Sequence, residues 1–331
     1  MQVIYDALHA DDVPSGTVVT VGNYDGIHLG QQSVLELVVA RARATGLLAT
    51  VVTFDPHPLA VLQPESAPPR ITTATQRERL LDGLGVDLVL VIRFTPEFAR
   101  TPARSFVRDF LHGRLRAEEI YVGANFSFGH RREGDVSLLQ QMGEPYGFRT
   151  FAVDEVRIEG ERASSTRIRR LLREGQVADA ARLLGRPYAL TGLVARGDRM
   201  GQRLGWPTIN VIPDNELVPL DGVYASRVYF PSFSSTFDSA TNIGTRPTVY
   251  ENFERVVESH ILDFAADVYG ESVELLFYRR LREERIFQSM MDLSAQIRRD
   301  VDATRELFRA VRQQEEAELA ASAADGAAPA Q

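Results

Sequence analysis

The sequence predicts an α/β domain followed by an all-β domain: an open sheet with helices, then a small antiparallel β-barrel with a long C-terminal helix. Three observations support this fold class. Up to about residue 184, short apolar runs alternate with amphipathic stretches, as in α/β folds. From Tyr188 onward, short β-rich segments are separated by Gly, Pro and Asp, as in small barrels. A helical apolar pattern then runs from Ser289 to about Glu318, and 331 residues suffice for two domains.

The composition excludes several classes of protein. The net charge of −8 argues against a nucleic-acid binder, because such proteins usually present a basic face. The chain contains no cysteine, which excludes disulfides and thiolate chemistry, and its six histidines are too scattered for a structural zinc site. We find no basic, apolar leader and no run of eighteen apolar residues. We therefore expect a cytoplasmic enzyme that acts on small molecules, with neither nucleic acid nor membrane as a partner.

Four short apolar runs in the first half predict buried parallel strands, because each is bounded by turn residues. These runs are Val18–Val21, Leu47–Phe54, Leu88–Ile92 and Ile120–Val122. Amphipathic stretches predict helices at Ser33–Ala44, Ala103–Leu111, Val136–Met142, Ser165–Arg173 and Val177–Leu184. Gly185 and Pro187 then break the helical pattern, so we expect a first domain over residues 1–186.

The second half is expected to form a domain over residues 187–316, followed by a disordered tail over 317–331, which is rich in Ala with Gly and Pro. Its predicted strands are Ala189–Ala195, Val223–Phe230, Ala240–Ile243, Val256–Leu262 and Val273–Phe277. After the last strand comes a group of arginines that reads as a solvated face: Arg279, Arg280, Arg282 and Arg285.

Residues 197–210 read GDRMGQRLGWPTIN and form the most distinctive stretch of the chain. The spaced glycines Gly197, Gly201 and Gly205 leave backbone N–H groups free to approach an anion. Thr208 and Asn210 then offer two oxygens on the same side of an extended segment, a donor set that suits Mg²⁺ beside phosphates. The alternative is a glycine-rich hairpin turn. The stretch is not a Walker loop, because that motif requires a lysine and this chain has none.

Three further blocks follow PTIN in order: DGVY from Asp221, NIGTRPTV from Asn242 and ESHILDF from Glu258. Together these four blocks resemble the riboflavin kinase module. The resemblance implies that the three glycines contact ATP phosphates, that Thr208 and Asn210 hold Mg²⁺, and that Arg246 lies near phosphate or flavin. It also implies that Glu258 takes the proton of the riboflavin hydroxyl. Without that context, Glu258 is typical of a solvated strand glutamate.

A second group of blocks lies in the first half, where the predicted strands end. Residues 21–31 read VGNYDGIHLGQ, and Gly22, Gly26 and Gly30 permit a tight turn into the first helix. The helix N-terminus favours phosphate, and His28 is placed to donate to it. The alternative is an ordinary turn with an incidental histidine. The blocks TFDPHP, VGANFSFG and ASSTRIR, which begin at residues 53, 122 and 163, would lie at the same edge of the sheet.

These blocks resemble the FMN adenylyltransferase half of the bacterial bifunctional riboflavin kinase/FAD synthetase family, and the resemblance then covers about Val18 to Asp300. It implies a Rossmann-like nucleotidyltransferase α/β domain ahead of a β-barrel kinase domain. The implied catalytic residues of the first domain are His28, Asn125 and Arg169. Contacts with ATP or phosphate are implied for Gly22, Asp25, Gly30, Gln31, Ser164, Ser165 and Thr166. Flavin contacts are implied for Phe54, His57, Pro58, Phe126 and Phe128.

One residue departs from the family pattern HxGH, because the chain reads His28-Leu-Gly-Gln31. An amide can donate a hydrogen bond but carries neither a proton nor a charge, and all 37 basic residues are arginine. Two interpretations stay open. Either the amide suffices with Arg169, and the chain converts riboflavin to FMN and FMN to FAD; or the first half is a weakened or non-catalytic nucleotide- or flavin-binding module beside an active kinase. The expected ligands are ATP, riboflavin, FMN, FAD and Mg²⁺, and a homo-oligomer is left open.

Overall fold

The computed structural model describes residues 1–197, 200–247 and 253–325, which form two compact units. The first unit comprises Met1–Ile168 with Leu183–Gly185, and the second comprises Arg169–Arg182 with the chain from Arg186. Residues 169–182 were expected in the first domain, yet they cluster with the second unit. They belong to helices α6 (Ser165–Arg173) and α7 (Val177–Leu184), whose bounds match the predicted ones.

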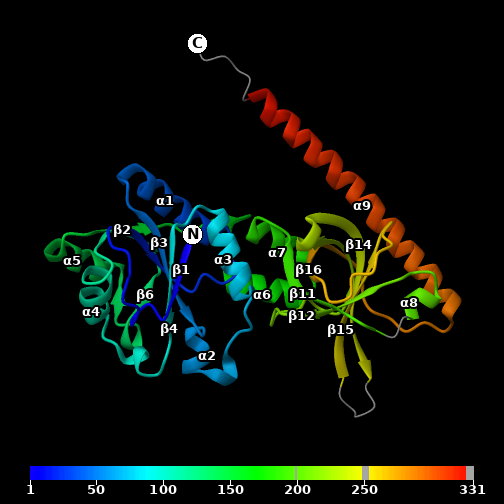
Figure 1. Ribbon diagram of the computed structural model, residues 1–331, viewed down its shortest axis with the longest axis horizontal. Helices are drawn as coiled ribbons and strands as arrows, with labels where there is room; N and C mark the ends of the chain where they lie inside the picture. Colours follow the sequence, from blue (N-terminus) through cyan, green and yellow to red (C-terminus); the bar gives the residue numbers. More distant parts are fainter. Residues whose placement is uncertain (198–199, 248–252, 326–331) are drawn as a thin grey trace. The chain divides into compact units, whose positions relative to one another are not determined.

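The described residues of the first unit contain a six-stranded parallel sheet, which confirms the predicted open α/β architecture (Figure 1). Its spatial order is β1-β4-β3-β2-β5-β8. The strands are β1 (Gln2–Tyr5), β2 (Thr17–Val21), β3 (Leu48–Asp55), β4 (Leu88–Arg93), β5 (Ala117–Gly123) and β8 (Arg149–Val153). Because all six strands run parallel, their carboxyl ends meet at one edge.

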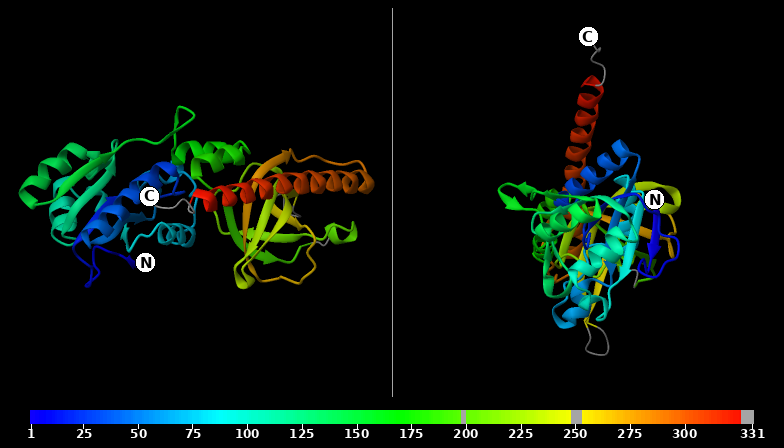
Figure 2. Two further views of the ribbon diagram at one scale, coloured as in Figure 1. Left: turned by 90° about the horizontal axis from the view of Figure 1, so that it is seen from above. Right: turned by 90° about the vertical axis from the view of Figure 1, so that its left-hand side faces the viewer.

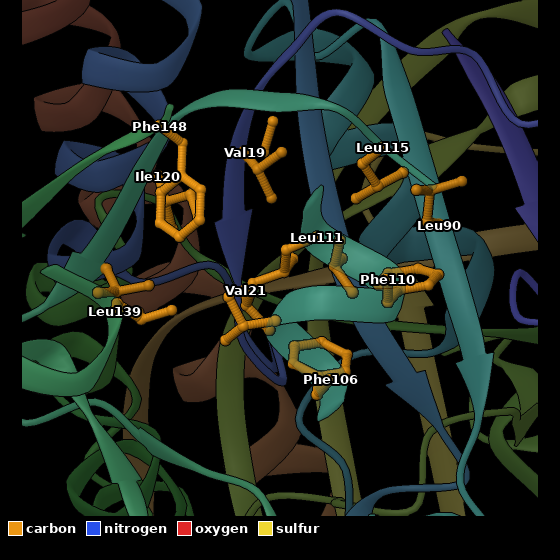
Figure 3. Close-up of a cluster of buried hydrophobic side chains, with 14 of the residues drawn as sticks. Val19, Val21, Leu90, Phe106, Phe110, Leu111, Leu115, Ile120, Leu139 and Phe148 are labelled. Carbon is orange, nitrogen blue, oxygen red and sulfur yellow. The ribbon is translucent and has the colours of Figure 1, made fainter. Parts of the chain in front are cut away.

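Helices cover both faces of this sheet. Successive strand residues point to opposite sides, so the strands contribute apolar side chains to both helical layers. Val19 and Val21 pack with Phe106, Phe110 and other side chains of one helical layer, as Figure 3 shows. Val18 packs on the opposite layer. The first layer consists of α4 (Ala103–Ser105), the π-helix η3 (Phe106–His112) and α5 (Val136–Tyr146), and the second of α1 (Leu29–Thr45) and α3 (Ala74–Gly83).

Shorter elements of the first unit lie in the connections and carry several of the predicted site blocks. They are α2 (Pro58–Leu62), η1 (Pro64–Ser66), η2 (Phe98–Arg100), β6 (Ser127–Phe128), η4 (His130–Arg132), β7 (Gly134–Asp135), β9 (Arg157–Ile158) and β10 (Glu161–Arg162).

The second unit is built on a closed antiparallel barrel, again as predicted, with strand order β11-β12-β15-β14-β13-β16. Tyr224 of the DGVY block is fully buried in it, donates a hydrogen bond to the Leu220 carbonyl and packs edge-on against Phe277. That block therefore serves the barrel core. The elements are β11 (Tyr188–Ala195), α8 (Met200–Arg203), β12 (Ile209–Pro213), β13 (Gly222–Phe230), η5 (Pro231–Phe233), β14 (Ser235–Pro247), β15 (Phe253–Ile261) and β16 (Ser272–Arg282).

Helix α9 (Met290–Asp325) lies along the barrel wall (Figure 2). Val301 and Phe308 are buried, and Arg305 pairs with Asp263 at 2.7 Å. Residues 317–325, which belong to the expected tail, are helical and continue α9. Alanine, which makes up most of this segment, is the strongest helix former. Residues 326–331 lie outside the described residues.

Candidate active sites

In the second unit, the glycines of the GDRMGQRLG loop lie against the two side chains predicted to hold metal. A Cβ atom placed on Gly197 would lie 2.2 Å from Asn210 Nδ2, and one on Gly201 would lie 3.2 Å from Thr208 Oγ1. Both positions therefore admit only glycine without rearrangement. Gly205 is exposed and has a φ of +81°, a conformation that favours glycine.

Strand pairing brings residues from three of the predicted blocks into one row. Glu258 on β15 faces Asn210 on β12 and Asn242 on β14 as its direct cross-strand partners. Side chains of such partners lie on the same face of the sheet within contact range. Arg246 belongs to β14, and its side chain lies outside the described part of the chain.

Two members of this row, Glu258 and Asn242, line a cavity of about 300 Å³ between the barrel wall and the start of α9. Thr208, Glu258 and Gly201 all line it, so the structure brings these three predicted residues together. The remaining lining residues are Leu204, Trp206, Val223, Ala240, Asn242, His260, Arg282, Glu284, Arg285, Phe287, Leu293, Ile297 and Asp300.

The prediction of a solvated arginine face is wrong for Arg282, whereas Arg285 is exposed as predicted and also lines the cavity. Arg282 is bound to the buried carboxylate of Asp300 through two of its nitrogens, at 2.9 to 3.1 Å. The guanidinium groups of Arg282 and Arg285 lie 5.6 and 5.0 Å from the ring centre of Phe287. These partners come from the residues after β16 and from α9, so the arginine pattern alone could not reveal them. Together they form one wall of the cavity.

A second cavity, of about 400 Å³, shares Thr208 with the first. Its wall comes mainly from the segment after β15, including Phe264 and Tyr269. Arg196 stacks on Tyr269, with its guanidinium carbon 5.5 Å from the ring centre. The second unit thus offers two adjoining cavities with one common residue.

In the first unit, the turn after β2 has an unusual backbone. Tyr24 and Ile27 have φ values of +45° and +43°, a region that side chains other than glycine rarely adopt. The Asp25 carboxylate accepts hydrogen bonds from the N–H groups of Ile71 and Thr72, at 2.9 and 3.1 Å. The hydroxyl of Ser165 donates to the Asp25 carbonyl oxygen at 2.8 Å. These bonds give Asp25 a structural task and fix this turn.

His28 and Gln31 form the N-terminus of α1. His28 is the N-cap and is buried, and its backbone N–H donates to Gln31 Oε1 at 3.2 Å. A Cβ atom on Gly30 would lie 3.2 Å from the His28 ring, so the ring packs directly on that glycine. Gln31 thus does what a glutamine three residues after the N-cap commonly does, which is to bind back to the N-cap backbone.

The predicted flavin residues lie near the carboxyl ends of β3 and β5. Phe54 belongs to a row of aromatic rings that passes through Phe98 and Phe106 to Phe128 and Phe126, with ring centres 5.4 to 6.1 Å apart. Within that row the rings also pack on the hydrophobic core. His57 and Pro58 begin α2, and Asn23 Nδ2 lies 3.1 Å from His57 Nε2.

The remaining predicted residues have the following surroundings. The Asn125 amide donates to the carboxylate of Glu155, and the Ser164 hydroxyl accepts from the Arg167 N–H at 3.3 Å. Thr166 is exposed in the first turn of α6, whereas Arg169 is buried and belongs to the second unit. Gly22 donates its N–H to the Val52 carbonyl at 3.0 Å, which joins the turn to β3.

Two family models match the chain in the order of its two halves. One described as FAD synthetase matches residues 10–167, and one described as riboflavin kinase matches residues 184–308. The bifunctional riboflavin kinase/FMN adenylyltransferase of Escherichia coli (strain K12) is 39% identical over 293 residues, covering 88% of this chain and 93% of that protein. The chain belongs to the bifunctional riboflavin kinase/FMN adenylyltransferase family.

A second relative carries the same name, and one solved structure shares the fold. The Haemophilus influenzae protein of the same name is 34% identical over 313 residues and covers 93% of this chain and 99% of its own length. A crystal structure described as a macrolide-efflux protein from Streptococcus pneumoniae aligns with a TM-score of 0.83 at 29% identity, over 92% of this chain and 98% of that one. The predicted family, fold class and pair of enzyme activities are confirmed. Nothing in the matches favours the non-catalytic interpretation of the first half.

One further residue of the adenylyltransferase half was not predicted. Arg77 on α3 is 8% exposed and lines a small polar cavity with Asn23, Asp25, Asp55 and His57. Burial lowers the pKa of its guanidinium. The residue sits in a polar helix with few apolar positions, so the sequence carried no signal for it.

Within residues 1–197, 200–247 and 253–325, no helix has the length and hydrophobicity that a membrane crossing needs.

Proposed function

We propose that the second unit transfers the γ-phosphoryl group of ATP to riboflavin with Glu258 as general base. The observation that supports it is the cross-strand row of Asn210, Glu258 and Asn242, in which Glu258 and Asn242 line a cavity that the PTIN turn also lines. A carboxylate in this position can accept the proton of the 5′-hydroxyl as its oxygen attacks phosphorus in line. The bond from the γ-phosphorus to the bridging oxygen then breaks, and ADP leaves.

The two adjoining cavities suggest how the substrates are divided. We assign riboflavin to the cavity with Glu258 and Phe287, whose aromatic and apolar wall suits a flat ring. We assign the nucleotide to the cavity with Phe264 and Tyr269. Thr208 borders both cavities, so the transferred phosphoryl group would pass beside it.

The donor set fits Mg²⁺ at this point. Thr208 and Asn210 offer neutral oxygens, and Mg²⁺ commonly takes only one or two protein oxygens beside phosphates and water. Among the described residues there is no cluster of three His, Asp or Glu side chains that would offer a more crowded site. Bound there, the ion would neutralise charge on the phosphates, while Gly197 and Gly201 allow the backbone to come close.

In the first unit we propose that FMN phosphate attacks the α-phosphorus of ATP and pyrophosphate leaves. His28 at the start of α1 would donate to the phosphates, with Asn125, Ser164, Ser165 and Thr166 as further contacts. The phosphate nucleophile is already ionised, so the step needs no general base. We assign Gln31 to the support of His28, since its carbonyl oxygen binds the His28 backbone.

The flavin of this half would lie along the aromatic row from Phe54 to Phe126, next to His57 and Pro58. We further propose a cytoplasmic location, because ATP and free flavins are the substrates and the 331 residues include no cysteine. A homo-oligomer and the domain boundary at residue 186 stay predictions.

The test is a time course with purified protein, riboflavin, ATP and Mg²⁺, in which FMN and FAD are separated chromatographically. We expect FMN to appear first and FAD to follow, with one pyrophosphate released per FAD. A second reaction starts from FMN and isolates the adenylyl transfer. If the protein makes FMN but forms no FAD in this second reaction, the interpretation of the first half as a binding module would be supported instead.

A further inference from the structure

The turn that leads into PTIN is tightly packed on its inner side. Trp206 donates its backbone N–H to the Gly201 carbonyl at 2.8 Å. A Cβ atom on Gly201 would lie 2.3 Å from the Trp206 carbonyl oxygen, so the two backbones touch at this point. This contact fixes the backbone of Trp206. It does not reach the peptide between Pro207 and Thr208, which needs a separate interaction to fix its orientation.

That peptide is held by His260. The Nδ1 atom of His260 lies 2.8 Å from the Pro207 carbonyl oxygen, and a carbonyl can only accept, so Nδ1 carries the hydrogen. The bound oxygen belongs to the peptide that joins Pro207 to Thr208. Fixing the plane of this peptide fixes the direction in which the Thr208 side chain leaves the backbone.

The imidazole is itself held in place. It packs edge-on against Trp206, with ring centres 5.4 Å apart at 87°. The Trp206 indole N–H donates to the Ser294 hydroxyl on α9 at 3.1 Å. His260 also lies two residues after Glu258 on β15, and both line the same cavity. Its ring therefore joins the strand of the proposed base, the PTIN turn and, through Trp206, helix α9.

We infer that His260 is a positioning residue for phosphoryl transfer, which acts by holding the Pro207–Thr208 peptide. This inference rests on the proposed role of Thr208 beside Mg²⁺ and phosphate. It assigns His260 neither proton transfer nor contact with the reacting atoms. Loss of the hydrogen bond should therefore affect the Mg²⁺ and ATP requirements of FMN formation more than the KM for riboflavin.

The experiment compares His260→Asn, His260→Gln and His260→Ala in the full chain. The Asn side-chain amide can occupy the place of Nδ1 and still donate to Pro207, whereas the longer Gln places its amide where Nε2 was. We expect Gln and Ala to raise the Mg²⁺ concentration for half-maximal FMN formation about tenfold, the scale of one hydrogen bond. Asn should stay within about threefold of wild type, because its hydrogen bond is retained.

A second readout needs neither metal nor nucleotide. Trp206 is the only tryptophan of the 331 residues, so its fluorescence anisotropy reports directly on the turn. In protein without ligands, we expect lower anisotropy for Gln and Ala and a value near wild type for Asn. FAD formation from supplied FMN belongs to the other unit and controls for the amount of intact protein, while thermal unfolding followed by Trp206 emission serves as the folding control for the barrel.

Several results would overturn the inference. One is a His260→Asn protein as impaired and as mobile at Trp206 as His260→Ala, because the hydrogen bond would then be irrelevant. Another is three variants that all match wild type. The role of Thr208 is tested separately by Thr208→Ala. If this variant keeps the wild-type Mg²⁺ requirement, the proposed metal site is refuted. If its Mg²⁺ requirement changes while the His260 variants behave like wild type, only the positioning role of His260 is refuted.

Discussion

At the scale of single residues, Glu258 gains its proposed role from its neighbours. It stands between two asparagines in a cross-strand row, and no acidic partner of its own strand faces the same cavity among the residues described. Its position on a cavity wall next to the PTIN turn supports the proposed role over that of a solvated strand glutamate.

Glu258→Gln should lower the turnover of FMN formation about a hundredfold or more, because a general base acts mainly in the transition state. Riboflavin binding should change much less. The measurement is kcat and KM for riboflavin, with exposed Glu283→Gln as the matched control. A wild-type turnover in Glu258→Gln would make Glu258 a structural residue.

Glu119 on β5 illustrates the opposite case, a buried charge with no part in either site. It is 2% exposed and accepts hydrogen bonds from Arg41 at 2.7 and 3.0 Å, from Tyr121 at 2.9 Å and from Arg149. The hydrogen bonds from Arg41 are the main cause that lowers the pKa of this carboxyl from 4.5 to about 2. Its charged form is therefore the one that the fold stabilises.

Since the pKa of Glu119 is lower in the folded chain, its contribution is complete above the unfolded value of 4.5 and fades as pH falls toward about 2. Glu119→Gln should reduce the free energy of unfolding by about 2 kcal/mol near neutral pH, less than for a fully buried pair because the arginines are partly exposed. Urea unfolding at a series of pH values measures this difference, which should shrink below pH 4.5. Exposed Glu118→Gln should show neither effect.

At the scale of elements, α9 does more than cover the barrel. Its buried Asp300 binds Arg282, and its Gln296 donates to the same carboxylate at 2.7 Å. This helix thereby keeps Arg282 and Phe287 at the wall of the cavity assigned to riboflavin.

Asp300→Asn removes the charge but keeps the shape of the side chain. Because hydrogen bonds between charged groups contribute about 1.5–3 kcal/mol, we expect the KM for riboflavin to rise at least about tenfold. FAD formation from FMN should not change. Exposed Asp302→Asn on the same helix is the control, and an equal response of both variants would contradict the proposed wall.

Elements with strong apolar runs could be predicted from the sequence, whereas those with polar or exposed surfaces could not. The runs of β2 to β5 are buried on both faces, so periodicity identified them. Strand β8 is mostly exposed and α3 buries Gln76 and Arg77 with a single leucine, so neither showed a clear pattern. Composition predicts a disordered tail for the alanine-rich end of α9, although the high helix propensity of alanine favours a helix there.

The same distinction holds for the sites. The blocks at strand ends were predictable, because parallel strands bring their carboxyl ends together and glycine spacing marks backbone approach. The wall of Arg282, Phe287 and Asp300 was not, since it depends on contacts between segments that are separate in sequence. The sequence presents Gln31 as a substitute phosphate ligand, whereas in the structure its side chain binds the His28 backbone.

At the scale of the whole molecule, the chain passes to the second unit after Gly185, where the helical pattern ends, but residues 169–182 also cluster with that unit. Leu172 accepts a hydrogen bond from Leu220 at 3.0 Å, and Gly175 packs on Arg280, so residues 169–182 support the barrel unit. The sequence pattern, which simply changes at Gly185, contains no trace of this.

A kinase fragment that starts at Ser164 should therefore melt at a higher temperature than one that starts at Pro187. The longer fragment keeps the helical pair that packs on the barrel unit, and buried leucines contribute about 1.5–3 kcal/mol each. Thermal unfolding of both fragments, followed by Trp206 emission, checks this expectation. Equal melting temperatures would mean that the helices belong functionally to the first half.

The closed barrel and the open sheet also differ in the unpaired strand edges with which a second copy of the chain could pair at high concentration. Every barrel strand among the described residues has two neighbours, so its backbone offers no free edge. The parallel sheet ends at β1 and β8. The first of these has four residues, and the second begins with the charged Arg149. Short and charged edges discourage intermolecular strand pairing. Aggregation through added strands should therefore begin at the sheet, once β1 or β8 loosens, and the barrel should resist it.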